Sequence, residues 1–214
     1  MTTLSPSEAA LALGQIYLDD DKPAQAIESF QRAARDGNAA ALNMLGRIHE
    51  RGWGVEPDPA VAAAYFTKAA NANDVWAMFN LADLYLLGRG VTQSDAKAHH
   101  LYATAASLGH SKSLNMLGIM AEEGRGPDTP SRAQAYFLAA AKAGDVWAQF
   151  NLARRMIDAK QIAQAIPWLE LSLQKGFAEY WRMLAHSLAE HGDERLRQIA
   201  TRAATLLGSE SSPV

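Results

Sequence analysis

A nine-residue segment occurs twice in this chain with a single change. The letters "DVWAMFNLA" run from Asp74 to Ala82, and "DVWAQFNLA" runs from Asp145 to Ala153, seventy-one residues later. A catalytic site needs its set of residues only once, whereas recurrence at a fixed distance is typical of repeat architectures. The period of this repeat therefore constrains the fold more than any other feature of the sequence.

Shorter echoes show that the repeating unit has about 36 residues. "GWGV", "GRGV" and "GRGP" begin at residues 52, 88 and 124, and "NMLG" at 43 and 115 alternates with "FNLA" at 79 and 150. An old duplication of a two-unit block would produce this alternation. We predict one domain, residues 1–208, with units at about 8–39, 40–75, 76–111, 112–146, 147–179 and 180–208. The polar residues 209–214 are predicted to form a disordered tail.

Each unit reads as two helices. In "AALNMLGRIHERG" the apolar residues Leu42, Leu45 and Ile48 recur at a helical spacing. The following Gly-x-Gly segment favours a helix end, because glycine readily adopts the left-handed conformation of a C-cap. The chain is therefore expected to be all-α, with about six antiparallel helix pairs, 11 to 13 helices and no strands.

Capping residues mark the expected helix starts. Asp58 and Thr129 each precede a proline, and Ser94 occupies the equivalent place in the unit between them. Asp74 and Asp145 stand where the first helices of two units begin. All five side chains are predicted to accept hydrogen bonds from the first turn of their helix.

Taken together, these residues resemble the Sel1-like repeat, a relative of the tetratricopeptide repeat. The resemblance rests on small-x-x-x-Leu-Gly, Gly-x-Gly-Val and Ala-x-x-Tyr-Phe-x-x-Ala-Ala, and it is best over residues 40–144. The first and fifth units look closer to plain tetratricopeptide repeats. The resemblance implies a right-handed superhelical solenoid with the first helices on the concave face. It also implies an adaptor or scaffold for protein partners, with no catalytic residues to carry over.

If the first helices pack as in that family, the residue two positions before the core leucine faces the groove. Amide groups there would bind a peptide backbone, and phenyl rings would bind its side chains. Residues two positions past the leucine would add charge selectivity. The predicted partner-binding residues of the concave face are Asn43, Arg47, Phe79, Asp83, Asn115, Phe150 and Arg154.

An alternative interpretation makes the same positions structural. Phe79 and Phe150 would then pack between neighbouring repeats, and the asparagines would bond local backbone. The repeated Trp76 and Trp147 are expected to pack between repeats. Trp53 is different because later copies of its loop carry arginine there, so it is predicted to be an exposed loop anchor.

Composition excludes several classes of function. The net charge of −3 does not favour a nucleic-acid partner, and the absence of cysteine excludes disulfides and thiolate metal sites. His99 and His100 are adjacent and point in different directions on a helix, so no metal site and no cofactor are predicted.

The first 21 residues resemble neither a signal peptide nor a membrane span, which favours a cytoplasmic protein without membrane contact.

These observations favour a non-catalytic scaffold that binds a peptide or a partner protein. The chain is expected to be a monomer, with weak pairing through the ends of the repeat array as an alternative. A regulatory receptor for a small molecule is the rival function, and it predicts a deep pocket lined by the same phenylalanines. An enzyme would need convergent acid, base or metal groups, and no recognisable catalytic motif is present in the sequence.

Overall fold

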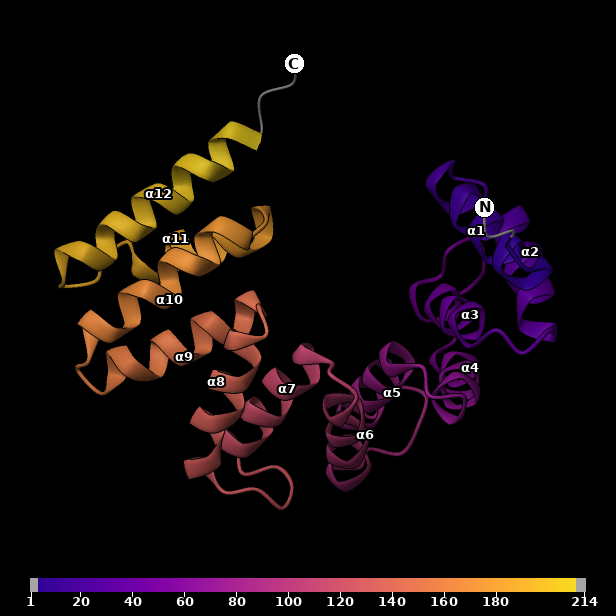
Figure 1. Cartoon of the computed structure of the whole chain (residues 1–214), viewed down its shortest axis with the longest axis horizontal. Helices are drawn as coiled ribbons and strands as arrows, with labels where there is room; N and C mark the ends of the chain where they lie inside the picture. Colours follow the sequence, from indigo (N-terminus) through magenta and orange to yellow (C-terminus); the bar gives the residue numbers. More distant parts are fainter. Residues whose placement is uncertain (1–3, 211–214) are drawn as a thin grey trace. The chain divides into compact units, whose positions relative to one another are not determined.

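The computed structural model describes residues 4–210, and within them it contains twelve α-helices, one short 3-10 turn and no strand (Figure 1). The predicted all-α class and the predicted number of helices are confirmed for these residues. The helices are α1 (Pro6–Asp19), α2 (Pro23–Arg35), α3 (Ala39–Arg51), α4 (Pro59–Asn71), α5 (Val75–Leu87), α6 (Asp95–Ser107), α7 (Ser111–Glu122), α8 (Ala133–Lys142), α9 (Val146–Asp158), α10 (Ile162–Lys175), α11 (Ala178–Leu188) and α12 (Glu194–Glu210), with the 3-10 turn η1 at Pro130–Arg132.

These elements fall into two compact units. The N-terminal unit contains the residues up to 113 together with 125–127, and the C-terminal unit contains 114–124 together with the residues from 128 onward. Each repeat expected from the sequence corresponds to two consecutive helices, from α1 and α2 to α11 and α12. The first helix of each pair is called the first helix below, and the other the second helix. The single domain of residues 1–208 stays a prediction.

In the N-terminal unit, the second helices α2 and α4 each pack on the first helix of the following repeat. One hydrophobic cluster joins α2 to α3, and a second joins α4 to α5. The buried residues at these two contacts share a pattern, with two alanines and a phenylalanine on the second helix facing an aliphatic stripe on the next first helix. They are Ala26, Phe30 and Ala33 against Ala41, Leu45 and Ile48, and Ala62, Phe66 and Ala69 against Ala77, Leu81 and Leu84.

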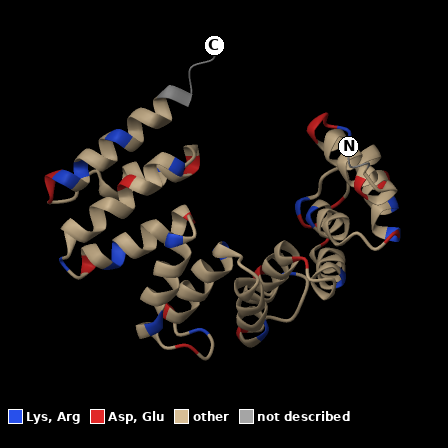
Figure 2. Cartoon of the chain, viewed as in Figure 1, with Lys and Arg blue, Asp and Glu red and all other residues tan. Residues whose placement is uncertain are grey.

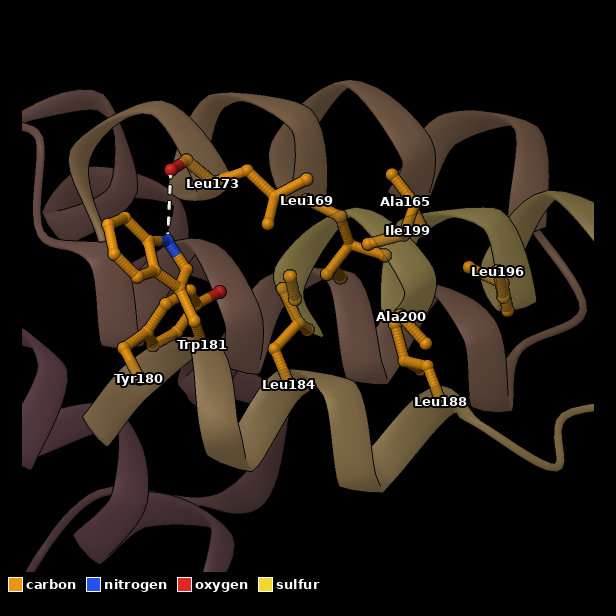
Figure 3. Packing of buried hydrophobic residues seen from close by; sticks show 12 residues of the cluster. Ala165, Leu169, Leu173, Tyr180, Trp181, Leu184, Leu188, Leu196, Ile199 and Ala200 are labelled. Carbon is orange, nitrogen blue, oxygen red and sulfur yellow. Dashed lines mark hydrogen bonds between the residues drawn. The ribbon is translucent and has the colours of Figure 1, made fainter. Parts of the chain in front are cut away.

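The C-terminal unit repeats this packing and ends in a larger cluster formed by α10, α11 and α12. Figure 3 shows Leu169 and Leu173 of α10 above Leu184 of α11, with Ile199 of α12 completing the cluster. The Trp181 indole N–H donates to the Leu173 carbonyl oxygen at 3.1 Å, so this polar group is satisfied inside an apolar environment. Trp181 is buried, whereas Trp168 is only partly buried and packs against this cluster.

The Leu-Gly pair of the repeat has a steric cause. A Cβ atom added at Gly46 would lie 2.5 Å from the ring of Phe66, which belongs to the second helix of the same repeat. Gly118 faces Phe137 in the same way, also at 2.5 Å. The glycine therefore lets the aromatic ring of the second helix lie directly against the first helix.

Most of the predicted helix caps are present. Asp58, Ser94, Asp74 and Asp145 each accept a hydrogen bond from a backbone N–H in the first turn of their helix. The prediction for Thr129 is wrong, because its side chain makes no capping bond and the chain enters η1 instead. Its hydroxyl lies 2.8 Å from the hydroxyl of Ser131, which satisfies it locally.

The C-terminal end of the chain is helical further than the repeat pattern suggested. Helix α12 extends to Glu210, two residues beyond the boundary expected at 208. The remaining part of the predicted disordered tail, residues 211–214, lies outside the described residues.

We predict that Gly46→Ala destabilises the chain by about 1–3 kcal/mol, because the added methyl group overlaps the Phe66 ring. Helix propensity alone would give the opposite sign, since alanine is favoured over glycine in a helix interior by about 1 kcal/mol. Urea denaturation followed by circular dichroism measures the change. In a Phe66→Leu background the same substitution should cost less, and an unchanged cost in that background would contradict the contact.

Candidate partner-binding surfaces

An amide pair joins two first helices of the N-terminal unit. The Asn80 side-chain N–H on α5 donates to the side-chain oxygen of Asn43 on α3, at 2.9 Å. Asn43 is only 8% exposed, and its side-chain oxygen already has an intramolecular partner in Asn80. Neither the predicted peptide clamp nor the backbone alternative included this pairing.

The C-terminal unit contains the same amide pair. The Asn151 side-chain N–H on α9 donates to the side-chain oxygen of Asn115 on α7, again at 2.9 Å. Asn80 and Asn151 each follow a predicted phenylalanine directly, so the repeated "FNLA" letters carried the signal for both pairs. The amides act first as links between neighbouring first helices, and their part in binding a partner stays a prediction.

Asp83 lies in a charged and partly buried environment. The Tyr102 hydroxyl donates to its carboxylate, while Arg89 forms an ion pair with Glu50 nearby. Burial, together with the Glu50 charge, raises the pKa of Asp83 to about 6, against the lowering effects of the Tyr102 hydrogen bond and the nearby arginines. As a selectivity residue, Asp83 would therefore change its charge near pH 6.

Arg154 also has partners within its own unit. Its guanidinium lies 2.5 Å from one oxygen of Glu122, and Arg155 contacts the other oxygen at 2.5 Å. A weaker contact of 3.8 Å reaches Asp158. This bridge joins α7 to α9, and the side chain of Arg154 nonetheless remains 41% exposed.

The two phenylalanines are half-buried. The Phe79 ring packs against Tyr102 and His110, with centroids at 5.6 and 5.2 Å. Phe150 packs against the α10–α12 cluster. Both rings have packing partners within their own unit and keep part of their surface accessible, and their role as groove or packing residues stays a prediction.

His110 was not singled out from the sequence. It stands before α7, in the place where Asn38 caps α3 and Asp74 caps α5, and its Nδ1 lies 2.9 Å from the Ser113 hydroxyl. Its Nε2 is buried without a hydrogen-bond partner, and burial lowers the pKa of the ring. Trp76, which is 48% exposed, packs edge-on against it, whereas Trp147 packs on Phe177 and Tyr180.

A pocket lies beside Trp53, which was predicted to be an exposed loop anchor but is half-buried because it packs against the hydrophobic cluster that joins α2 to α3. The exposed Arg47 guanidinium stacks over the indole at 5.2 Å from its centroid, and the pocket has a volume of about 510 Å³. Its lining combines apolar side chains with two carboxylates from the end of α1 and the turn after it. The lining residues are Gln15, Leu18, Asp19, Asp21, Pro23, Met44, Arg47, Gly52, Trp53 and Gly54.

The pocket unites two of the predicted residues that the sequence had assigned to different places. Arg47 was expected on the concave face and Trp53 in a separate loop. Asp19 and Asp21 were not predicted, because nothing in the repeat pattern links the turn after α1 to the loop after α3. Cation–π stacking of this kind holds both side chains at one edge of the pocket.

The geometry of stacked helix pairs agrees with a comparison of the sequence with protein families. The Sel1 repeat model matches four segments, residues 7–38, 39–74, 77–110 and 111–145. The chain belongs to the Sel1 repeat family. The match includes the first repeat, which the sequence alone had likened to a plain tetratricopeptide repeat. Membership of this family accounts for the recurrence of both the Leu-Gly pair and the Gly-x-Gly segment along the chain.

Curated relatives are similar over parts of their length. Human protein sel-1 homolog 2 is 41% identical over 78 residues, which is 36% of this chain and 11% of the human protein. Chitin synthase regulatory factor 3 of Schizosaccharomyces pombe is 30% identical over 169 residues, 74% of this chain and 18% of that protein. The chain thus spans less than a fifth of the length of these two relatives.

A solved structure shows the same fold. The Sel1 repeat protein from Oxalobacter formigenes superposes with a TM-score of 0.80 at 24% identity, covering 97% of this chain and 89% of that one. This likeness concerns the arrangement of the helices.

Two other kinds of site are absent from the part of the chain that the structure describes. Within residues 4–210, no helix is both long and apolar enough to cross a membrane, and no group of three or more histidine or acidic side chains is placed to hold a metal ion. Acidic and basic residues are interspersed along the helices of both units (Figure 2).

We predict that Asp83→Asn removes a pH dependence of stability. Because the pKa of Asp83 is about 6 in the folded chain, against a usual 3.8, the folded chain holds the proton more tightly than the unfolded chain. Its contribution is therefore present at low pH and lost as the pH rises through about 6. Between about pH 4 and pH 7, the free energy of unfolding of the variant should rise by on the order of 1 kcal/mol relative to that of wild type.

Urea denaturation at several pH values checks this prediction. Asp36→Asn, which removes an exposed carboxylate after α2, is the control for the change in net charge. A constant difference between wild type and Asp83→Asn across the range would show that the carboxyl group is not perturbed.

Proposed function

We propose that this chain is a non-catalytic adaptor that binds a peptide segment of a partner protein through its first helices. The anchoring point is the Arg47–Trp53 pocket, and this pocket is the observation that carries the proposal. Its volume of about 510 Å³ lies within the range of ligand pockets in proteins.

The lining of the pocket supports a peptide as the ligand. Leu18, Met44 and Trp53 offer apolar contacts for an aliphatic or aromatic side chain. Asp19 and Arg47 supply charges of both signs at its edge, which would set the orientation and the choice of the residues on either side. Tryptophan and arginine are among the residue types most enriched among side chains that dominate binding energy, and here the half-buried Trp53 and the exposed Arg47 line one pocket.

The remaining predicted residues extend the surface along each unit. Phe79 and the Asn43–Asn80 pair lie on first helices of the N-terminal unit, and Phe150, Arg154 and the Asn115–Asn151 pair lie on first helices of the C-terminal unit. An amide that keeps a free N–H after pairing still donates to a peptide carbonyl. These residues are proposed to bind an extended peptide segment. In each pair, the hydrogen bond between the two amides holds both side chains in position.

The family and a relative support a regulatory role of this kind. Sel1 repeat proteins act as scaffolds for protein interactions, and the fission yeast relative is named as a regulatory factor. We propose that this chain likewise acts by bringing a partner to a complex rather than by chemistry of its own, in the cytoplasm.

Selection from a displayed library of random peptides tests the proposal without a known partner. The wild-type chain would be the target, and an Arg47→Glu/Trp53→Ala variant would be used to remove peptides that bind elsewhere. Enriched peptides should bind the double variant at least tenfold more weakly than wild type in fluorescence anisotropy, as loss of two dominant contacts implies. Leu87→Ala, at an exposed leucine outside the pocket, should bind normally.

Circular dichroism confirms that each variant is folded. Peptides that bind wild type and the double variant equally would place the binding surface elsewhere. If no peptide is enriched, while small molecules raise the melting temperature of wild type but not of the double variant, the pocket is a receptor site and the adaptor proposal is wrong.

A further inference from the structure

Helix α1 carries an apolar stripe on its exposed side. Ala9, Leu13 and Ile16 are spaced four and three residues apart, so they lie on one face of the helix with Ala12 beside them. Leu13 is 38% exposed and Ile16 is 55% exposed. Two large aliphatic side chains side by side on one helix face are a feature of contact surfaces.

The same three residue types at the same spacing are buried in the next repeat. Ala41, Leu45 and Ile48 of α3 are exposed by 0%, 1% and 0%. In α5 the corresponding positions are Ala77, Leu81 and Leu84, which are also buried. The stripe on α1 therefore has the composition of a face that this chain elsewhere covers completely.

The glycine of the repeat fixes this correspondence between α1 and α3. A Cβ atom added at Gly14 would lie 2.5 Å from the ring of Phe30, as one at Gly46 would from Phe66. Counting from Gly14 and Gly46, the alanine lies five residues before each glycine, the leucine one before and the isoleucine two after. The exposed stripe of α1 thus occupies the same structural position as the buried stripe of α3.

The structure also shows what kind of element covers such a stripe. The stripe of α3 packs against α2 through Ala26, Phe30 and Ala33. The stripe of α5 packs against α4 through Ala62, Phe66 and Ala69. In both cases the covering element is an amphipathic helix with small-x-x-x-Phe-x-x-small spacing.

Charge limits the occupant further. Helix α1 contains no lysine or arginine, and Glu8 and Asp19 flank its stripe. Helix α2, which covers the equivalent stripe of α3, carries Arg32 and Arg35 in its last turn. A helix with basic residues beside its apolar face would complement the acidic borders of α1.

We propose that the stripe Ala9–Leu13–Ile16 of α1 binds an amphipathic helix of a partner protein, with small-x-x-x-Phe-x-x-small spacing and basic flanking residues. The helix packs on α1 as α2 packs on α3. None of the three stripe residues lines the Arg47–Trp53 pocket, so this surface is separate from the peptide site proposed above.

A second copy of the chain fits the stripe less well than a partner helix. Four side chains on one helix fall short of the roughly 800 Å² per partner that a stable dimer buries. The exposed side of α12, the last helix, carries Gln198, Thr201, Arg202 and Thr205, so it does not supply the small-Phe-small pattern. A single helix from another protein does not have to bury the area of a stable dimer, and its sequence is free to carry the small-Phe-small pattern.

The chain itself provides a probe for the test. A fluorescein-labelled peptide with the sequence of residues 23–35, cross-linked to hold its helix, is titrated onto the full-length protein and followed by anisotropy. Cross-linking is needed because an isolated 13-residue helix is marginal in water. The peptide should bind wild type and the control variant Leu87→Glu equally, and Leu13→Glu/Ile16→Glu at least tenfold more weakly.

A second peptide tests the predicted aromatic contact. Phe30→Ala in the peptide should weaken its binding to wild type by at least tenfold. Ile16→Lys alone serves if the double variant loses its helical circular dichroism signal, because Ile16 is more than half exposed.

Three outcomes would overturn the proposal. The first is the absence of saturable binding to wild type. The second is equal binding to the stripe variants, which would show that the peptide displaces α2 or binds elsewhere. The third is a concentration-dependent dimer in analytical ultracentrifugation that Leu13→Glu/Ile16→Glu abolishes, which would make a second copy the occupant. Arg47→Glu/Trp53→Ala should leave peptide binding unchanged, which separates this proposal from the proposed adaptor site.

Discussion

The whole arrangement depends on one packing contact, in which the aromatic ring of a second helix lies between two first helices. Phe66 rests against the bare backbone of Gly46 in its own repeat and against the aliphatic stripe of α5 in the next. A side chain at Gly46 would separate the pair, and a polar stripe would leave the ring without a partner. Because one ring serves both contacts, the helix pair and the stacking of successive pairs are determined by the same few residues.

Polar links between first helices add to this apolar frame. An amide pair and a glutamate–arginine pair occur in each unit, Asn43–Asn80 with Glu50–Arg89 and Asn115–Asn151 with Glu122–Arg154. Such links satisfy groups that would otherwise be buried without partners. They also leave fewer side chains free for a ligand, and this is why the exposed Arg47 and the neighbouring Trp53 stand out as candidate anchors.

The repeat period was sufficient to predict the helices, their pairing and most of their caps. Asp58 and Ser94 cap as expected because capping depends on a few adjacent residues. Thr129 does not cap, since the chain enters a 3-10 turn there, although Thr129 precedes a proline just as Asp58 does. The partners of Asn43 and Asp83 were missed for another reason. Asn80 lies 37 residues from Asn43, so that contact depends on how successive pairs stack, whereas Tyr102 contacts Asp83 through the packing of two helices within one pair.

The side-chain links between repeats have a kinetic consequence. Asn80 to Asn43 spans 37 residues, and Arg89 to Glu50 spans 39, so each link closes a loop of about one repeat. Loops of this size close at a modest entropic cost, and a chain held by them is able to fold outward from any formed pair. The same links make adjacent repeats open together during partial unfolding. A ligand that spans two first helices would therefore slow the opening of both repeats, and hydrogen exchange at those helices would report its binding even far from the contact.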